Sequence, residues 1–115
     1  MIVAGFGFSS RASTASLRDA LAITGETVDA LATLADKADA LAALAQELGL
    51  PMIPVTAPLP DTPTQSPHSL RERGTGSVAE ACALAAAGAG GYLRCTRVTS
   101  GDRLATCAIA QGGTL

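Results

Sequence analysis

The fold depends on residues 26–51, ETVDALATLADKADALAALAQELGLP. Two different structures suit this stretch, and each of them would give a different fold. Apolar residues recur there at helical intervals, and this period predicts one long helix over residues 27–48. The same residues also allow a strand over residues 28–34, VDALATL, followed by a new helix that begins at Asp39, a good N-cap residue. Gly49 ends the helix in both interpretations. The residues alone therefore leave open whether the centre of the chain is helical or alternates between strand and helix.

The segment before this stretch predicts one strand and one helix. The first eight residues, MIVAGFGF, combine a β-branched run with two glycines, which is typical of a buried strand that enters a turn. A helix is predicted over residues 15–23, with Ser13 and Thr14 as its best N-cap candidates and Gly25 as its stop signal.

The segment after it predicts a further helix between strands. Residues 52–55, MIPV, suit a short buried strand, and the Pro-, Ser- and Thr-rich residues 56–74 suit a long surface loop. A helix over residues 77–87 is followed by GAGG, and then by a strand, a turn and a strand over residues 92–110, a terminal hairpin. Together these elements predict a single α/β domain over residues 1–115, with about three helices and about five strands.

The composition excludes several classes of function. Of 115 residues, 48% are hydrophobic, but one is Tyr, two are Phe and none is Trp, so surfaces for base stacking are scarce. The net charge is −2 and the Lys and Arg residues are scattered, which argues against a nucleic-acid or membrane-surface role. The start lacks the basic segment of a signal peptide, and no apolar run is long enough to span a bilayer. We expect a cytoplasmic protein.

The three cysteines, Cys82, Cys95 and Cys107, are predicted to be buried, reduced thiols. Each lies in an apolar context, and the sequence contains no C-x-x-C pair. His68 is the one histidine, so the sequence predicts no metal site, and no cofactor is expected. His68 shares the Pro-rich loop with Ser66, but the sequence displays no partner that would activate a nucleophilic serine.

The stretch GTGSVAEACALAAAG, residues 74–88, carries the most distinct local motif. Ser77 and Glu80 fit a capping box, in which the Ser77 hydroxyl accepts from the Glu80 N–H and the Glu80 carboxylate accepts from the Ser77 N–H. This pattern explains both residues without catalysis. Gly74 and Gly76 would leave the helix start open to an anion, because N–H groups and a positive partial charge lie there. The two roles are compatible.

Gly5 and Gly7 raise the question of a nucleotide site. The third glycine of a G-x-G-x-x-G fingerprint would fall on Ser10, so a plain glycine turn is the better interpretation. Arg11 lies beside the start of the first predicted helix. If the two helix starts follow neighbouring strands, their positive ends should meet at one crevice, the usual ligand position in open α/β sheets.

Three further cations, Lys37, Arg71 and Arg73, could add positive charge at the rim of such a crevice. Each of them equally suits a solvated surface position. We find no strong enzyme signature among these residues.

Four stretches in chain order resemble the CobE and CbiG C-terminal domain family of cobalamin biosynthesis. They are VAGFGF, LATLADKADALAALAQELGLP, QSPHSLRERGTGSVAEACALAAAG and TCAIA, and they span nearly the whole chain. The length suits the stand-alone CobE form of the family. The resemblance implies a three-layer α/β/α sandwich with a mixed sheet of about five strands and a C-terminal β-hairpin. It also implies that residues 28–34 are a strand, with Lys37 after its end.

The resemblance further implies a set of residues that bind a ligand. The glycine loop of the family maps onto the residues after the first predicted strand, and its G-x-G-S-V-A-E segment maps onto residues 74–80. In many relatives the first loop reads like GCRRG, whereas here it reads GFSSR, so no role of that cysteine applies. The implied ligand-binding residues are Gly5, Gly7, Ser9, Arg11, Lys37, Ser66, Gly74, Gly76 and Ser77.

The implied function belongs to cobalamin biosynthesis, in one of three forms. The first is a protein that binds or hands on a precorrin, a tetrapyrrole whose many carboxylates would suit two helix starts with Arg11 and Lys37. The second is a hydrolase that opens a precorrin lactone as CbiG does, with Glu80 as general base and Lys37 stabilising the oxyanion. The third is a non-catalytic partner that stabilises another enzyme of the pathway. We expect the first, and the exposed edge of the terminal hairpin could pair two subunits into a homodimer.

Overall fold

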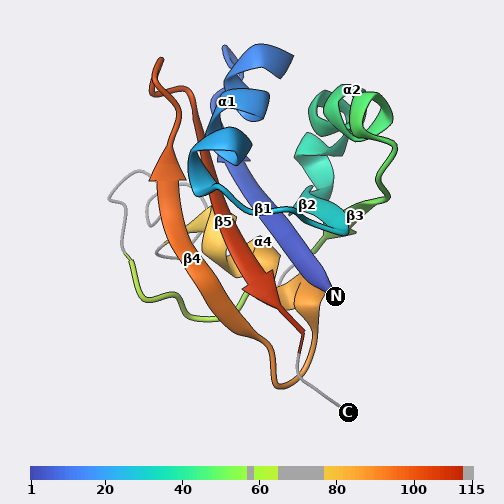
Figure 1. The fold of residues 1–115 in the computed structure, drawn as a ribbon, viewed down its shortest axis with the longest axis vertical. Coiled ribbons are helices and arrows are strands. Elements are labelled where there is room, and N and C mark those ends of the chain that lie inside the picture. The colour runs from blue at the N-terminus through green and yellow to red at the C-terminus, as the bar shows by residue number, and fades with distance from the viewer. Residues whose placement is uncertain (57–58, 65–76, 113–115) are drawn as a thin grey trace.

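The computed structural model describes residues 1–56, 59–64 and 77–112 of the chain. Its centre alternates between strand and helix, so the single long helix that the apolar period suggests does not form (Figure 1). The elements in chain order are β1 (Ile2–Phe8), α1 (Thr14–Thr24), β2 (Ala30–Leu34), a 3-10 turn η1 (Ala35–Lys37), α2 (Ala38–Leu48), β3 (Met52–Val55), α4 (Val78–Ala87), β4 (Tyr92–Thr99) and β5 (Ala105–Gln111).

Strand β2 is the element that the residues alone could not assign. All five of its residues are buried, because it lies between β1 and β3 and is covered by helices on both faces. A strand in this position has no solvent-facing side and carries a continuous apolar run instead of an alternating one. A run of Ala and Leu residues also matches a helical period, so the pattern was compatible with both structures.

The start of α2 differs from the sequence prediction. The helix begins at Ala38, and its N-cap residue Lys37 makes no side-chain capping bond. Asp39, predicted as the N-cap, lies in the first turn instead, because the η1 turn leads directly into the helix. Its carboxylate still lies where the helix dipole favours negative charge.

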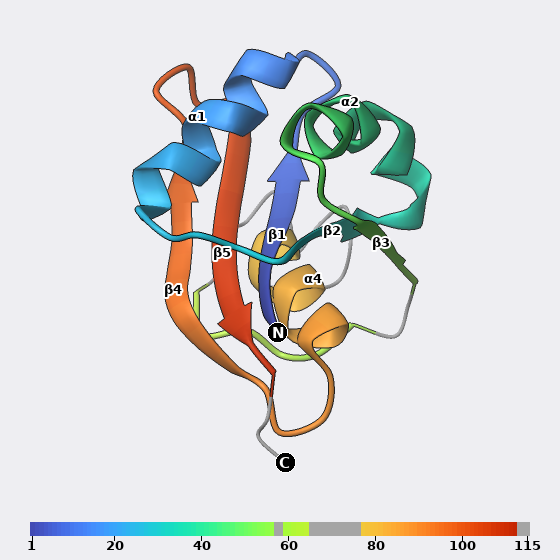
Figure 2. The same cartoon turned by 45° about the vertical axis from the view of Figure 1, so that its right-hand side comes forward.

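The sheet is mixed and has the strand order β3-β2-β1-β5-β4. Strands β1, β2 and β3 pair in parallel, whereas β5 pairs antiparallel with both β1 and β4. Helices α1 and α2 cover one face of the sheet and α4 covers the other (Figures 1 and 2). Each face has its own apolar cluster, one around Phe6, Leu17 and Leu41 and the other around Val3 and Cys82. The three-layer α/β/α sandwich is therefore confirmed.

The terminal hairpin forms as predicted, with a longer turn. Strand β5 begins at Ala105 and not at Arg103, because residues 100–104 form the turn between the two strands. Arg103 takes a φ of 64° there, in the left-handed region. Within the described part of the chain, no helix is long and apolar enough to cross a membrane.

Candidate functional site

The described helices all begin at one edge of the sheet, where the parallel strands β1 and β2 end (Figure 2). Helix α1 follows β1, and η1 and α2 follow β2. Helix α4 begins beside the end of β1, since a Cβ added to Gly7 would lie 3.2 Å from the Val78 Cβ. This carboxyl edge is the usual ligand position in open α/β sheets. The two helix starts singled out in the sequence, those of α1 and α4, lie at this edge on opposite faces.

On the side of β1 that faces β2, side chains replace the backbone ladder at the end of the strand. Backbone pairing of β1 with β2 extends to Gly5 and Ala32. Beyond this pair the Thr33 hydroxyl donates to the Phe6 carbonyl at 2.9 Å, and the Lys37 ammonium donates to the Phe8 carbonyl at 2.9 Å. The end of β1 is thus joined to the segment after β2 through side chains.

Lys37 is held in place at this edge. Its Nζ bonds to the Phe8 carbonyl and lies 5.1 Å from the centroid of the Phe8 ring, a cation–π distance. The side chain is half-buried. An ammonium carries three donors, and the Phe8 carbonyl takes one of them. A fixed cation is suited to a carboxylate ligand, and the helix start beside it has no side-chain cap and carries Asp39 in its first turn.

The start of α1 is satisfied by the protein itself. Ser13 and Ser16 form a capping box, with the Ser16 N–H 3.2 Å from Ser13 Oγ and the Ser13 N–H 3.1 Å from Ser16 Oγ. Ser13 is therefore the N-cap, and Thr14 is the first helical residue. The Ser16 hydroxyl also donates to the Asp102 carboxylate. A negative charge from the chain already faces this helix start.

Asp102 is a residue that the sequence analysis missed. Its Oδ1 accepts from the Ser100 hydroxyl at 2.6 Å and from the Leu104 N–H at 3.0 Å. Hydrogen bonds hold the pKa of Asp102 below its usual value. The bond from Ser100 has the largest effect, and the bond from Ser16 has the next largest. Asp102 lies 86 positions from Ser16 in the chain, so no local pattern could have connected them.

Gly5 lies in the middle of β1, Gly7 lies near its end, and Ser9 and Arg11 lie in the loop after it. A Cβ on Gly5 would lie 2.2 Å from the Ala79 carbonyl oxygen, so close packing of α4 explains this glycine. The Ser9 hydroxyl accepts from the Arg11 N–H at 3.1 Å and shapes the loop. Arg11 is exposed beside the start of α1. Gly7, Ser9 and Arg11 therefore share the carboxyl edge with Lys37, whereas Gly5 lies in the middle of β1 under α4.

Ser77 caps α4 as predicted, but Glu80 does not close the capping box. Ser77 Oγ accepts from the Glu80 N–H at 3.3 Å. The Glu80 carboxylate accepts elsewhere: Oε1 from the Thr64 N–H and hydroxyl at 3.0 and 2.8 Å, and Oε2 from the Arg97 N–H at 2.8 Å. Arg97 lies between Cys95 and Val98, where the pairing register of β4 and β5 shifts. Its N–H therefore lies in an irregular part of the ladder, and the Glu80 carboxylate accepts from it. The predicted bond from Glu80 back to Ser77 is wrong.

Some residues proposed from the sequence lie outside the described part of the chain. This applies to three implied ligand-binding residues and to three other loop residues. They are Ser66, Gly74, Gly76, His68, Arg71 and Arg73.

The predicted burial of the cysteines is confirmed for Cys82 and Cys107 and is wrong for Cys95. All three are free; Cys82 and Cys107 are buried, and Cys95 is partly exposed. Burial raises the pKa of the Cys107 thiol far above its usual value. Among residues 1–56, 59–64 and 77–112, no group of three or more His, Cys, Asp or Glu side chains could hold a metal ion.

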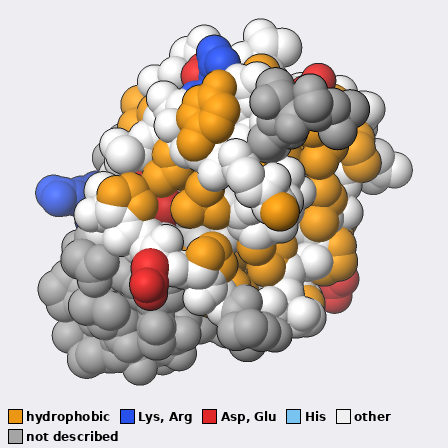
Figure 3. Space-filling model, turned by 90° about the horizontal axis from the view of Figure 1, so that it is seen from below, with side chains coloured by type: hydrophobic (Ala, Val, Ile, Leu, Met, Phe, Trp, Pro, Cys, Tyr) orange, Lys and Arg blue, Asp and Glu red, His pale blue; other side chains and the backbone are white. Residues whose placement is uncertain are grey.

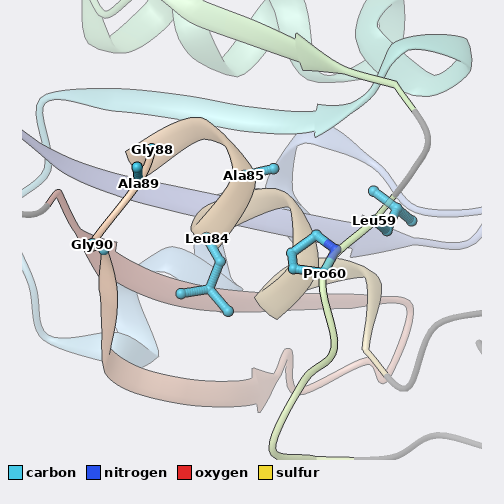
Figure 4. Close-up of a pocket in the computed structure, with 8 residues that line it drawn as sticks. Leu59, Pro60, Leu84, Ala85, Gly88, Ala89 and Gly90 are labelled. Atoms are coloured by element: carbon cyan, nitrogen blue, oxygen red, sulfur yellow. The ribbon is translucent and has the colours of Figure 1, made fainter.

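A shallow groove lies at the other end of α4, away from Lys37. Its volume is about 590 Å³, and mostly apolar or small residues form its lining (Figure 4). The lining residues are Leu59, Pro60, Leu84, Ala85, Gly88, Ala89, Gly90 and Gly91.

Comparison with known proteins assigns the chain to one family. The profile described as cobalamin synthesis G, C-terminus, matches residues 2–110, so the chain belongs to this family. Its members include proteins of cobalamin biosynthesis, and we assign the chain to that pathway. No curated protein sequence matches the chain significantly.

Two solved structures support the assignment. The crystal structure of CobE, a protein from the cobalamin (vitamin B12) biosynthetic pathway, is 31% identical with a TM-score of 0.78; the match covers 96% of this chain and 89% of that one. The cobalamin biosynthesis protein chiG from Agrobacterium tumefaciens strain C58 is 29% identical with a TM-score of 0.67, over 99% of this chain and 100% of that one. The family resemblance read from the sequence is confirmed.

Proposed function

We propose that the protein binds a precorrin-type tetrapyrrole at the carboxyl edge of its sheet and hands it on unchanged. The observation that carries this proposal is the position of Lys37. Its ammonium is fixed 2.9 Å from the Phe8 carbonyl, beside the start of α2, which has no side-chain cap. Precorrins carry several acetate and propionate carboxylates, and a fixed ammonium with nearby N–H groups binds such groups.

Lys37 is the main anchor in this proposal, ahead of the two helix starts that the sequence suggested. The start of α1 already faces the Asp102 carboxylate, and Ser77 caps the start of α4. Arg11 is exposed at the same edge and would supply a second cation. A ligand with several carboxylates can contact both cations at once, which favours a polyanion over a single carboxylate.

Lactone hydrolysis has less support from the geometry. A general base must reach a water molecule next to the substrate. Glu80, the candidate base, has an exposed fraction of 0%, and its carboxylate accepts from Thr64 and Arg97. These hydrogen bonds give Glu80 a structural role, which explains its burial without catalysis.

A spectral titration with a stable metal-free corrin precursor tests the proposal. We expect a saturable shift with the ligand mass unchanged, and a dissociation constant about tenfold higher in Lys37→Ala, because a charge-assisted hydrogen bond is lost. Arg18→Ala is the matched control, since it removes one exposed cation of α1, which pairs with Glu47 of α2.

Three results would contradict the proposal in different ways. A changed ligand mass would mean catalysis. Equal affinities of Lys37→Ala and Arg18→Ala would place the ligand away from Lys37. No shift with any intermediate, together with co-purification of another enzyme of the pathway, would favour the role of a non-catalytic partner.

A further inference from the structure

Residues 59–64 form a short segment along α4, which we call the strap. At its first end, Leu59 is partly buried against the apolar cluster that contains Cys82. At its last end, the Thr64 N–H and hydroxyl both donate to Glu80 Oε1. The strap is therefore held by apolar packing at one end and by a buried carboxylate at the other.

The strap forms one wall of the groove at the end of α4. Leu59 and Pro60 lie on one side of the groove, and the Gly88–Gly91 turn lies on the other, with Leu84 of α4 between them (Figure 4). Hydrophobic side chains are exposed on this face of the molecule, seen from below in Figure 3. Leu59 and Pro60 of the strap form this wall, five and four residues before Thr64 in the chain.

The contacts of Glu80 require a carboxylate. Oε1 faces the Thr64 N–H and Oε2 faces the Arg97 N–H, so each oxygen lies opposite a backbone donor. A carboxylate accepts at both oxygens, whereas a glutamine amide accepts at one and donates at the other. A glutamine in either orientation would place its NH₂ group against a backbone N–H.

We propose that Glu80 is a positioning residue that fixes the strap on α4 through Thr64 and so sets one wall of the groove. Glu80 has an exposed fraction of 0%, and its bonds join α4, the strap and β4. The role does not depend on precorrin binding, which we place at Lys37 and Arg11.

Amide hydrogen exchange, followed by NMR, tests this role in two variants, Glu80→Gln and Thr64→Val. Thr64→Val keeps the Glu80 carboxylate but removes the Thr64 hydroxyl, one of its donors. In Glu80→Gln we expect the Thr64 amide to exchange about tenfold faster, with a much smaller change at Ile109 in the core of β5. In Thr64→Val we expect a local increase of about threefold at residue 64. Binding of the dye 1-anilinonaphthalene-8-sulfonate should increase in both variants as the groove opens.

Glu47→Gln is the control, because it makes the same chemical change at an exposed glutamate that pairs with Arg18. It should leave the exchange at Thr64 and the dye binding unchanged. Exchange at Thr64 that stays at the wild-type rate, or that rises by the same factor as at Ile109, would overturn the proposal. If Glu80→Gln does not fold, Thr64→Val decides the question by the same two criteria.

Discussion

Asp102 is the carboxylate that joins α1 to the β4–β5 turn. It accepts from Ser16 at the start of α1 and from Ser100 and Leu104 in the turn. Because the folded state holds the pKa of Asp102 below its usual value of 3.8, folding favours the ionised form. The carboxylate also faces a helix start, where the dipole favours negative charge.

We therefore expect Asp102→Asn to lower the free energy of unfolding at neutral pH. The stabilisation by Asp102 is fully present above pH 3.8 and is lost as the pH falls through the lower pKa of the folded state. Urea titrations over a series of acidic pH values should show the wild type and the variant converging. Ser16→Ala, which removes one donor, should lose part of the same effect, and a gap that stays constant with pH would contradict this account.

At the scale of elements, α4 packs against β1 through small residues. A Cβ on Gly5 would lie 2.2 Å from the Ala79 carbonyl oxygen and 2.4 Å from the Ala83 nitrogen, both backbone atoms of α4. These atoms cannot move by a change of rotamer, so the whole helix would have to shift. Overpacking of this kind typically costs up to about 3 kcal/mol.

We expect Gly5→Ala to lower the free energy of unfolding by about 3 kcal/mol, measured by urea denaturation. Gly101→Ala is the control, because its Cβ would lie 3.4 Å from Asp19 Oδ2, an ordinary contact. That change should cost less than about 0.5 kcal/mol. Equal losses in the two variants would show that α4 does not need a glycine at position 5.

The elements differ in how well the sequence predicts them. Helix α1 and the end of α2 at Gly49 could be predicted from local signals, because caps depend on residues close in the chain. Strand β2 could not, because its burial on both faces depends on strands and helices distant in sequence. The position of Lys37 after β2 came from the family resemblance. The contacts of Glu80 with Thr64 and Arg97 join segments 16 and 17 residues away, beyond the reach of a capping pattern.

At the scale of the whole molecule, the two ends of the sheet differ in chemistry. The carboxyl edge carries Lys37 and Arg11 together with helix starts, whereas the opposite end carries the groove lined by apolar and small residues. Binding of a polyanion at the carboxyl edge would add an attraction between opposite charges that the free protein lacks. Such attraction between partly exposed groups weakens as salt is added.

We therefore expect a metal-free corrin precursor with free carboxylates to raise the thermal midpoint of the protein. At about 100 times the dissociation constant, linkage adds about 2.7 kcal/mol, which for a domain of this size corresponds to roughly 10 °C. Scanning calorimetry at a fixed ligand concentration should give a smaller increase at high salt and in Lys37→Ala. The same precursor with its carboxylates esterified is the matched ligand control and should give little increase. Equal increases at low and high salt, or with the esterified ligand, would show that charge at the carboxyl edge does not drive binding.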